Sequence, residues 1–194
     1  MSTDADSDEA LMLRYADGDM AAFQSLYQRH RGGLYRYFLR QSDTDTCEEL
    51  FQDVWARVIQ ARKRYRPDAR FSTWLYTLAH NRLVDHWRQA GRRPQSGRDV
   101  DASEQVDCSG TSQSDPLRVA DLRDCIEQLL ALVRSLPDIQ RQAFLLKHEA
   151  GLTLAQISEA MQARTETTKS RLRYAMERLR AAMPAECLES SDHD

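Results

Sequence analysis

Residues 152–180, LTLAQISEAMQARTETTKSRLRYAMERLR, contain two apolar stripes at helical spacing, separated by a short polar break. The stripes consist of Leu152, Leu154, Ile157 and Met161 in the first helix, and of Thr168, Leu172, Ala175, Leu179 and Met183 in the second. Thr153 and Gln156 have the spacing of a capping box, which predicts that the first helix begins there. We expect the second helix to begin near Glu166, with Thr165 as its cap. The pattern is typical of a helix-turn-helix.

The face of the second helix that lies away from its apolar stripe is rich in hydroxyl and basic side chains. These are Thr167, Lys169, Ser170, Arg171, Arg173, Tyr174 and Arg178. Residues 164–180 hold six basic and two acidic side chains, a net charge of +4. Such a helix can offer hydroxyl and arginine groups to base edges and further basic groups to phosphates. Solvated basic faces are also common on helical domains that bind no DNA, so the rest of the chain has to decide between the two interpretations.

Charge is distributed very unevenly along the 194 residues, although the net charge is only −3. Residues 57–93 hold ten basic and two acidic side chains, or +8, whereas residues 99–127 hold two basic and eight acidic ones, or −6. Residues 1–10 and 186–194 each add −4. Separated basic blocks of this kind favour contact with a nucleic acid.

Several classes of protein are disfavoured by the composition. No apolar run is long enough to span a bilayer, and the acidic N-terminus lacks a signal-peptide pattern, so we expect no membrane insertion. The four cysteines (Cys47, Cys108, Cys125 and Cys187) are scattered, without a C-x-x-C pair. This scatter predicts a cytoplasmic protein with neither a disulfide framework nor a structural metal site, and no motif calls for a cofactor.

The periodicity predicts an all-α protein of two small helical domains joined by a flexible acidic linker. We expect helices around 8–16, 19–40, 45–62, 71–90, 117–134, 138–150, 153–161 and 166–183. Residues 93–116 are rich in Ser, Asp, Gly and Gln and nearly empty of large apolar residues, which is typical of a linker. The predicted domains are therefore 1–92 and 117–185, followed by an acidic tail over 186–194.

A second informative stretch, residues 64–93 (RYRPDARFSTWLYTLAHNRLVDHWRQAGRR), interleaves arginines with aromatic side chains. This combination suits single-stranded nucleic acid, because the arginines neutralise the backbone and the rings stack on bases. We expect Phe71 and Trp74 to lie in the core, since they belong to an apolar stripe. Tyr65, in the loop before the helix, is the better candidate for a base contact. Asn81 could read a base edge, and a plain solvated asparagine is equally compatible with the chemistry.

The third stretch, residues 46–60 (TCEELFQDVWARVIQ), predicts a helix with one buried and one acidic face. The acidic face carries Glu48, Glu49, Gln52 and Asp53. It fits either a solvated helix front or a docking face for a basic protein partner.

Together and in this order, these stretches resemble an extracytoplasmic-function sigma factor of the sigma-70 family. The matching segments are LYRYFLR, CEELFQDVW, FSTWLYTLAHNRLVDHWR, SLPDIQRQAFLLKHEAGLTLAQISEAM and KSRLRYAMERLR, and they cover nearly the whole chain. The resemblance implies that the first domain binds core RNA polymerase and melts the −10 promoter element. It implies that the second domain reads the −35 element in duplex DNA, and that an anti-sigma protein sequesters the chain.

The resemblance also assigns individual residues. The polymerase-binding residues would be Glu49, Gln52 and Asp53. The −10 contacts that we expect are Asn81, which the resemblance assigns, and Tyr65, Arg66, Arg70, Arg82 and Arg88, which the interleaved arginines and aromatic rings of residues 64–93 indicate. Asn81 would help hold an extruded non-template base, with residues 64–72 as the wall of the pocket. The −35 contacts would lie on the basic helix face defined above, residues 167–178.

The chain departs from the family pattern in its turn, where Gln162 replaces a frequent glycine, so we expect Gln162 to adopt a positive φ. Two alternatives remain for comparison. A stand-alone helix-turn-helix regulator would explain residues 152–180 but would leave the other two stretches without a task. An enzyme built on His80, Asp85 and His86 lacks the spacing of a helical metal pair. We therefore expect no catalytic residues.

Overall fold

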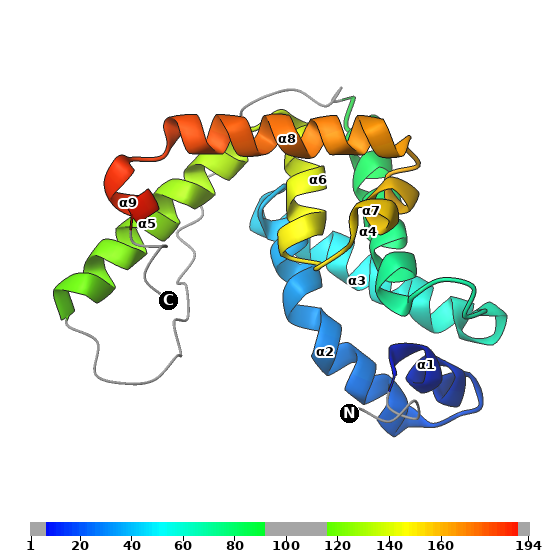
Figure 1. Ribbon diagram of the computed structural model, residues 1–194. Helices are drawn as coiled ribbons and strands as arrows, with labels where there is room; N and C mark the ends of the chain where they lie inside the picture. The colour runs from blue at the N-terminus through cyan, green and yellow to red at the C-terminus, as the bar shows by residue number, and fades with distance from the viewer. Residues whose placement is uncertain (1–6, 92–115, 190–194) are drawn as a thin grey trace.

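The computed structural model describes residues 7–91 and 116–189, and every regular element in these two ranges is a helix (Figure 1). Residues 92–115 lie outside the described residues, and they include all of the expected linker (93–116) except Pro116. The two ends of the chain, residues 1–6 and 190–194, lie outside them as well. No helix in the described ranges is long and apolar enough to cross a membrane. The all-helical fold is confirmed.

The N-terminal unit is built from four α-helices and one short 3-10 helix. These are α1 (Asp8–Ala16), α2 (Met20–Leu39), α3 (Thr44–Ala61), η2 (Arg62–Arg64) and α4 (Phe71–Gln89). The side chains of Ser7, Asp19 and Asp43 cap the first three α-helices, which explains why each helix begins where it does. Packed between the helices are fully buried side chains such as Leu26 and Leu50.

The C-terminal unit consists of α5 (Pro116–Ser135), α6 (Asp138–His148), α7 (Leu154–Ala160), α8 (Thr165–Ala182) and α9 (Ala185–Glu189). Figure 1 shows α8 lying across α6 and α7, and all three helices pack together. The predicted capping box of Thr153 and Gln156 is present at α7. The predicted Thr165 cap is wrong, because Arg164 has the extended backbone of a cap and Thr165 is already the first helical residue.

The turn between α7 and α8 has the predicted strain. Gln162 has a φ of 50°, a left-handed conformation that favours glycine. Thr168 occupies a fully buried position of the α8 stripe, and its hydroxyl donates a hydrogen bond to the Arg164 carbonyl at 3.3 Å. The hydroxyl is thus satisfied although it lies among apolar neighbours.

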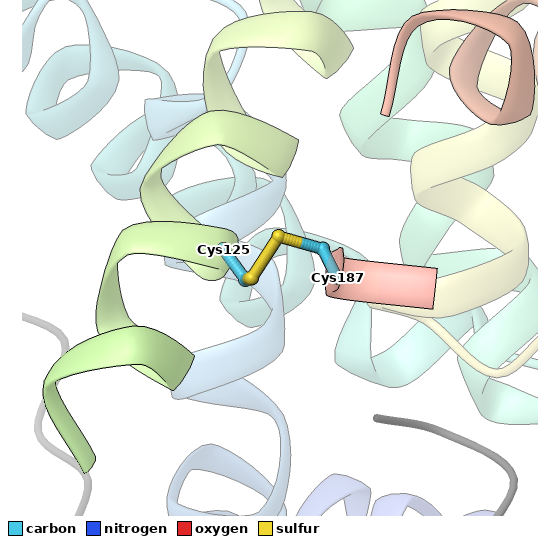
Figure 2. Close-up of a disulfide and its surroundings, with 2 residues drawn as sticks. All are labelled: Cys125 and Cys187. Carbon is cyan, nitrogen blue, oxygen red and sulfur yellow. A yellow bond between two sulfur atoms is a disulfide. The ribbon is translucent and has the colours of Figure 1, made fainter. Parts of the chain in front are cut away.

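A disulfide joins Cys125 of α5 to Cys187 of α9, with the two Cα atoms 5.6 Å apart (Figure 2). The expectation that scattered cysteines argue against disulfides is therefore wrong for this pair. Cysteines 62 positions apart carry no local spacing signal, and only the fold, which places α9 beside α5, brings them together. Since α9 spans residues 185–189, it also extends regular structure past residue 186, where we expected the tail to begin.

The two units contact each other mainly through α4 and α7, and α2 contributes ion pairs with the residue that follows α6. Glu149, directly after α6, accepts hydrogen bonds from Arg36 Nε at 2.7 Å and from Arg40 Nε at 2.6 Å, both on α2. A Cβ atom on Gly33 would lie 2.8 Å from the Tyr76 hydroxyl and 3.1 Å from the Glu149 carbonyl oxygen. The helices therefore approach closely only because residue 33 has no side chain.

Candidate nucleic-acid and polymerase interfaces

The predicted basic face of α8 is largely open to solvent. Thr167, Lys169, Arg173, Tyr174 and Arg178 are exposed, whereas Ser170 and Arg171 are half-buried. The Arg173 guanidinium lies over the Tyr174 ring at 5.0 Å and forms a long, 3.7 Å ion pair with Glu177. Such an exposed pair contributes little to stability, so the basic side chains on this face can meet a phosphate backbone.

Arg171 of this face acts electrostatically on His80 of the N-terminal unit. Burial lowers the pKa of His80 on α4 to about 4, and the nearby positive charge of Arg171 adds to this shift. Burial likewise lowers the pKa of Arg171. Arg171 of α8 is thus near enough to α4 for its charge to act on the His80 ring.

The residues predicted for the −10 element fall into three groups. Arg66, Arg70 and Arg88 are exposed. Asn81 is half-buried on α4. The two remaining residues, Tyr65 and Arg82, are buried.

Tyr65 differs from the expectation of a ring open to a base. It is only 8% exposed, and its ring packs at 5.1 Å from that of Trp74 and at 6.2 Å from that of Phe71. Burial raises the pKa of Tyr65 to about 12, with the nearby Glu9 adding to the effect. The Tyr65 ring thus joins the hydrophobic core together with Phe71 of α4, and this contact anchors the beginning of the loop.

Arg82 is the second difference, because its side chain is only 10% exposed and points into the unit. Its Nε donates to Asp53 at 2.6 Å and its Nη2 to Glu49 at 3.0 Å, both on α3. The structure thus joins one predicted DNA contact and two predicted polymerase contacts in a single ion-pair network. The side chains of Glu49 and Asp53 stay 61% and 43% exposed, and Gln52 beside them is also exposed. This acidic face remains accessible to a partner.

A sequence signal for this network was present but easily missed. Arg82 follows Leu75 by seven positions, which places it on the buried stripe of α4. Glu49 and Asp53 are four positions apart, so their carboxylates share one face of α3. An arginine on a buried stripe calls for carboxylate partners, and this pair supplies them.

The residues of the enzyme alternative do not form a metal site. The described residues contain no group of three or more His, Cys, Asp or Glu side chains that could hold a metal ion. His80 is buried, whereas Asp85 and His86 are only half-buried.

Comparison with known proteins gives the same domain order. Residues 26–93 match the family model of sigma-70 region 2, and residues 126–179 match that of sigma-70, region 4. The ECF RNA polymerase sigma factor SigK of Mycobacterium sp. (strain KMS) is 34% identical over 180 residues, covering 89% of this chain and 87% of the relative. The protein of the same description from Mycobacterium tuberculosis (strain CDC 1551 / Oshkosh) is 33% identical over 186 residues, covering 93% and 94%.

Two solved structures share the fold. CnrH, solved with the cytosolic domain of CnrY, superposes with a TM-score of 0.64 at 19% identity, covering 95% of this chain and 98% of CnrH. The sigma factor RpoE, solved with the anti-sigma factor NepR from Bartonella quintana, gives a TM-score of 0.60 at 17% identity, covering 87% and 98%.

A stand-alone regulator would not account for the match to region 2. With both sigma-70 regions present in order, and with relatives one-third identical over nearly the whole length, this chain belongs to the extracytoplasmic-function sigma factors of RNA polymerase.

Proposed function

We propose that this sigma factor divides promoter recognition between its two units, with α8 reading the −35 element and α4 and its preceding loop opening the −10 element. The observation that carries the proposal is the basic face of α8, where Thr167, Lys169, Arg173, Tyr174 and Arg178 are exposed to solvent. Neutralisation of phosphates by this face and by Arg66, Arg70 and Arg88 predicts binding that weakens steeply with salt.

Core RNA polymerase would dock on the acidic face of Glu49, Gln52 and Asp53. The network with Arg82 ties this face to α4, so polymerase binding and strand opening would share one rigid element. In this scheme the chain catalyses no reaction, because polymerase supplies the chemistry. The sigma factor would act in the cytoplasm, where it meets polymerase and promoter.

An anti-sigma protein is the remaining proposed partner. CnrH and RpoE, which share the fold of this chain, were each solved with a bound partner, and the RpoE partner is an anti-sigma factor.

Transcription in vitro tests the proposal. Core polymerase lacking any sigma factor is combined with this chain on a library of genomic fragments, and the starts of the transcripts are mapped. We expect initiation at a defined set of starts that share two upstream elements, whereas unaltered initiation at all starts would refute the proposal. A pull-down with core polymerase separates it from the stand-alone regulator, which binds specific DNA without polymerase.

The role of Asn81 is tested on one of those promoters. Asn81→Ala should impair open-complex formation, measured by permanganate reactivity of unpaired thymines, more than closed binding, measured at low temperature. Parallel loss in both measurements would remove Asn81 from the strand-opening site.

A further inference from the structure

The first helical residue of α4 is held by a side chain from another helix. Arg70 stands at the cap position of α4 and makes no side-chain capping bond. Instead, Glu9 of α1 accepts a hydrogen bond from the backbone N–H of Phe71, with 2.7 Å between Oε1 and N. A carboxylate in this position satisfies an open amide group and interacts favourably with the helix dipole. The start of α4 is therefore fixed from α1.

Neighbouring contacts hold α1 in the position that this bond requires. Asp8, beside Glu9, accepts a hydrogen bond from Arg29 at 2.9 Å and lies 2.6 Å from His30 Nε2 on α2. Against the effect of burial, the hydrogen bonds from His30 and Arg29 lower the pKa of Asp8. The His30 ring in turn packs 5.2 Å from that of Phe71. Glu9 is thus presented by a braced helix.

The loop before α4 depends on these contacts at both of its ends. It spans residues 65–70, between η2 and α4, and has no regular secondary structure. At its beginning, Arg62 of η2 lies over the ring of Tyr15 on α1, 5.7 Å from the centroid. At its end, Glu9 of α1 binds Phe71. One helix therefore brackets the whole segment that carries Arg66 and Arg70.

We propose that Glu9 is a positioning residue for strand opening. It fixes the first turn of α4, and with it the loop of residues 65–70, to which the proposed function assigns opening of the −10 element. This inference rests on the proposed function of α4 and its loop at the −10 element. Glu9 contacts no DNA itself, so its loss impairs capture of the extruded base and leaves −35 recognition and polymerase binding unchanged.

The experiment uses holoenzyme reconstituted from core polymerase and one of four sigma proteins: wild type, Glu9→Ala, Glu9→Gln or Asp17→Ala. Glu9→Gln retains an acceptor oxygen. Asp17→Ala is the matched control, since it removes an exposed carboxylate just after the same helix. The probe is a promoter fragment with an unpaired −10 element, prepared either intact or with an abasic site in place of the extruded base.

We expect Glu9→Ala to weaken binding to the intact probe about fivefold, the size of a lost helix cap, and to match wild type within about twofold on the abasic probe. Glu9→Gln should recover most of the loss, and Asp17→Ala should behave as wild type. Equal weakening on both probes would mean general damage to the unit and would overturn the inference, as would wild-type binding of Glu9→Ala to the intact probe. A wild-type holoenzyme that does not distinguish the two probes would instead contradict the proposed function of the loop.

Discussion

Arg82 of the N-terminal unit and the basic side chains on α8 of the C-terminal unit are placed in opposite ways. In the N-terminal unit, Arg82 turns inward and binds Glu49 and Asp53 across two helices. In the C-terminal unit, Lys169 and Arg178 extend from α8 into solvent, and no ion pair of theirs is found in the part of the chain that the structure describes. A surface that reads duplex DNA needs exposed charge, whereas a surface that captures an unstacked base needs a fixed shape. Arg82 therefore fixes α4 against α3, whereas the basic face of α8 is presented to solvent.

The largest expected effect on stability comes from the disulfide, which lies in the C-terminal unit. Replacing both disulfide cysteines, Cys125→Ser with Cys187→Ser, should lower the free energy of unfolding of the C-terminal unit by about 2–4 kcal/mol, because the bond restricts the unfolded chain. Hydrogen exchange during denaturant titration measures this for each unit. A reductant should reproduce the loss in wild type and leave the double variant unchanged. Equal losses in both units would show that they unfold together.

His80 tests the place where the units meet. Its pKa is about 4 in the folded protein, against 6.5 for a histidine in its ordinary solvated state, so the unfolded chain binds more protons between these values. Stability should therefore fall as the pH drops below 6.5, by about 2–3 kcal/mol near pH ~4.5 from this residue alone. His80→Gln should remove that part of the pH dependence, and His86→Gln on the same helix should retain it. An unchanged acid slope in His80→Gln would contradict burial of the neutral ring.

Replacing Arg82 tests whether the packing of α4 against α3 depends on the ion pairs of this arginine. Arg82→Met should lower the free energy of unfolding by about 1–3 kcal/mol, because two partly exposed carboxylates lose their partner. Arg88→Met is the matched control; its pair with Asp85 is exposed and 3.6 Å long, so we expect less than about 0.5 kcal/mol. Chemical denaturation measures both variants, and equal losses of stability would show that the buried Arg82 network stabilises the unit no more than the exposed Arg88 pair does.

On α8 the expected effect is on binding rather than on folding. Arg171→Ala should weaken binding that depends on the −35 sequence by about 1–3 kcal/mol if the side chain reads a base edge. Arg178→Ala should weaken binding to native and scrambled −35 sequences alike, as the loss of a phosphate contact does. Fluorescence anisotropy of holoenzyme with the two DNAs compares them. Equal loss on scrambled DNA for Arg171→Ala would make that residue a phosphate contact too.

The smallest effect concerns the turn into α8. Gln162→Gly should stabilise the C-terminal unit by about 0.5–1 kcal/mol, because glycine adopts the positive φ of this position without strain. Ala163→Gly, one position later, should destabilise the unit, since the chain there does not have a positive φ. Thermal unfolding of both variants shows whether the turn is strained, and a loss of stability in Gln162→Gly would show that it is not.

Local patterns predicted the helices and the exposed face of α8, because apolar spacing and caps act over a few residues. The capping box at Thr153 and the positive φ of Gln162 are of this kind. Contacts between distant segments were missed for the same reason. The hydrogen bond of Glu9 to Phe71 and the ion pairs of Glu149 join residues that are 62 to 113 positions apart. A repeat of a few residues in the sequence cannot predict such contacts.

A single substitution at Gly33 can alter the contact between the two units. A methyl group at this position would lie 2.8 Å from the Tyr76 hydroxyl, too close to be accommodated without a shift, and in tight contact at 3.1 Å with the backbone carbonyl oxygen of Glu149. Alanine there would act as a wedge that alters no charge and none of the proposed DNA contacts. Such a variant would weaken the contact between the two units without changing the residues proposed to bind DNA and polymerase.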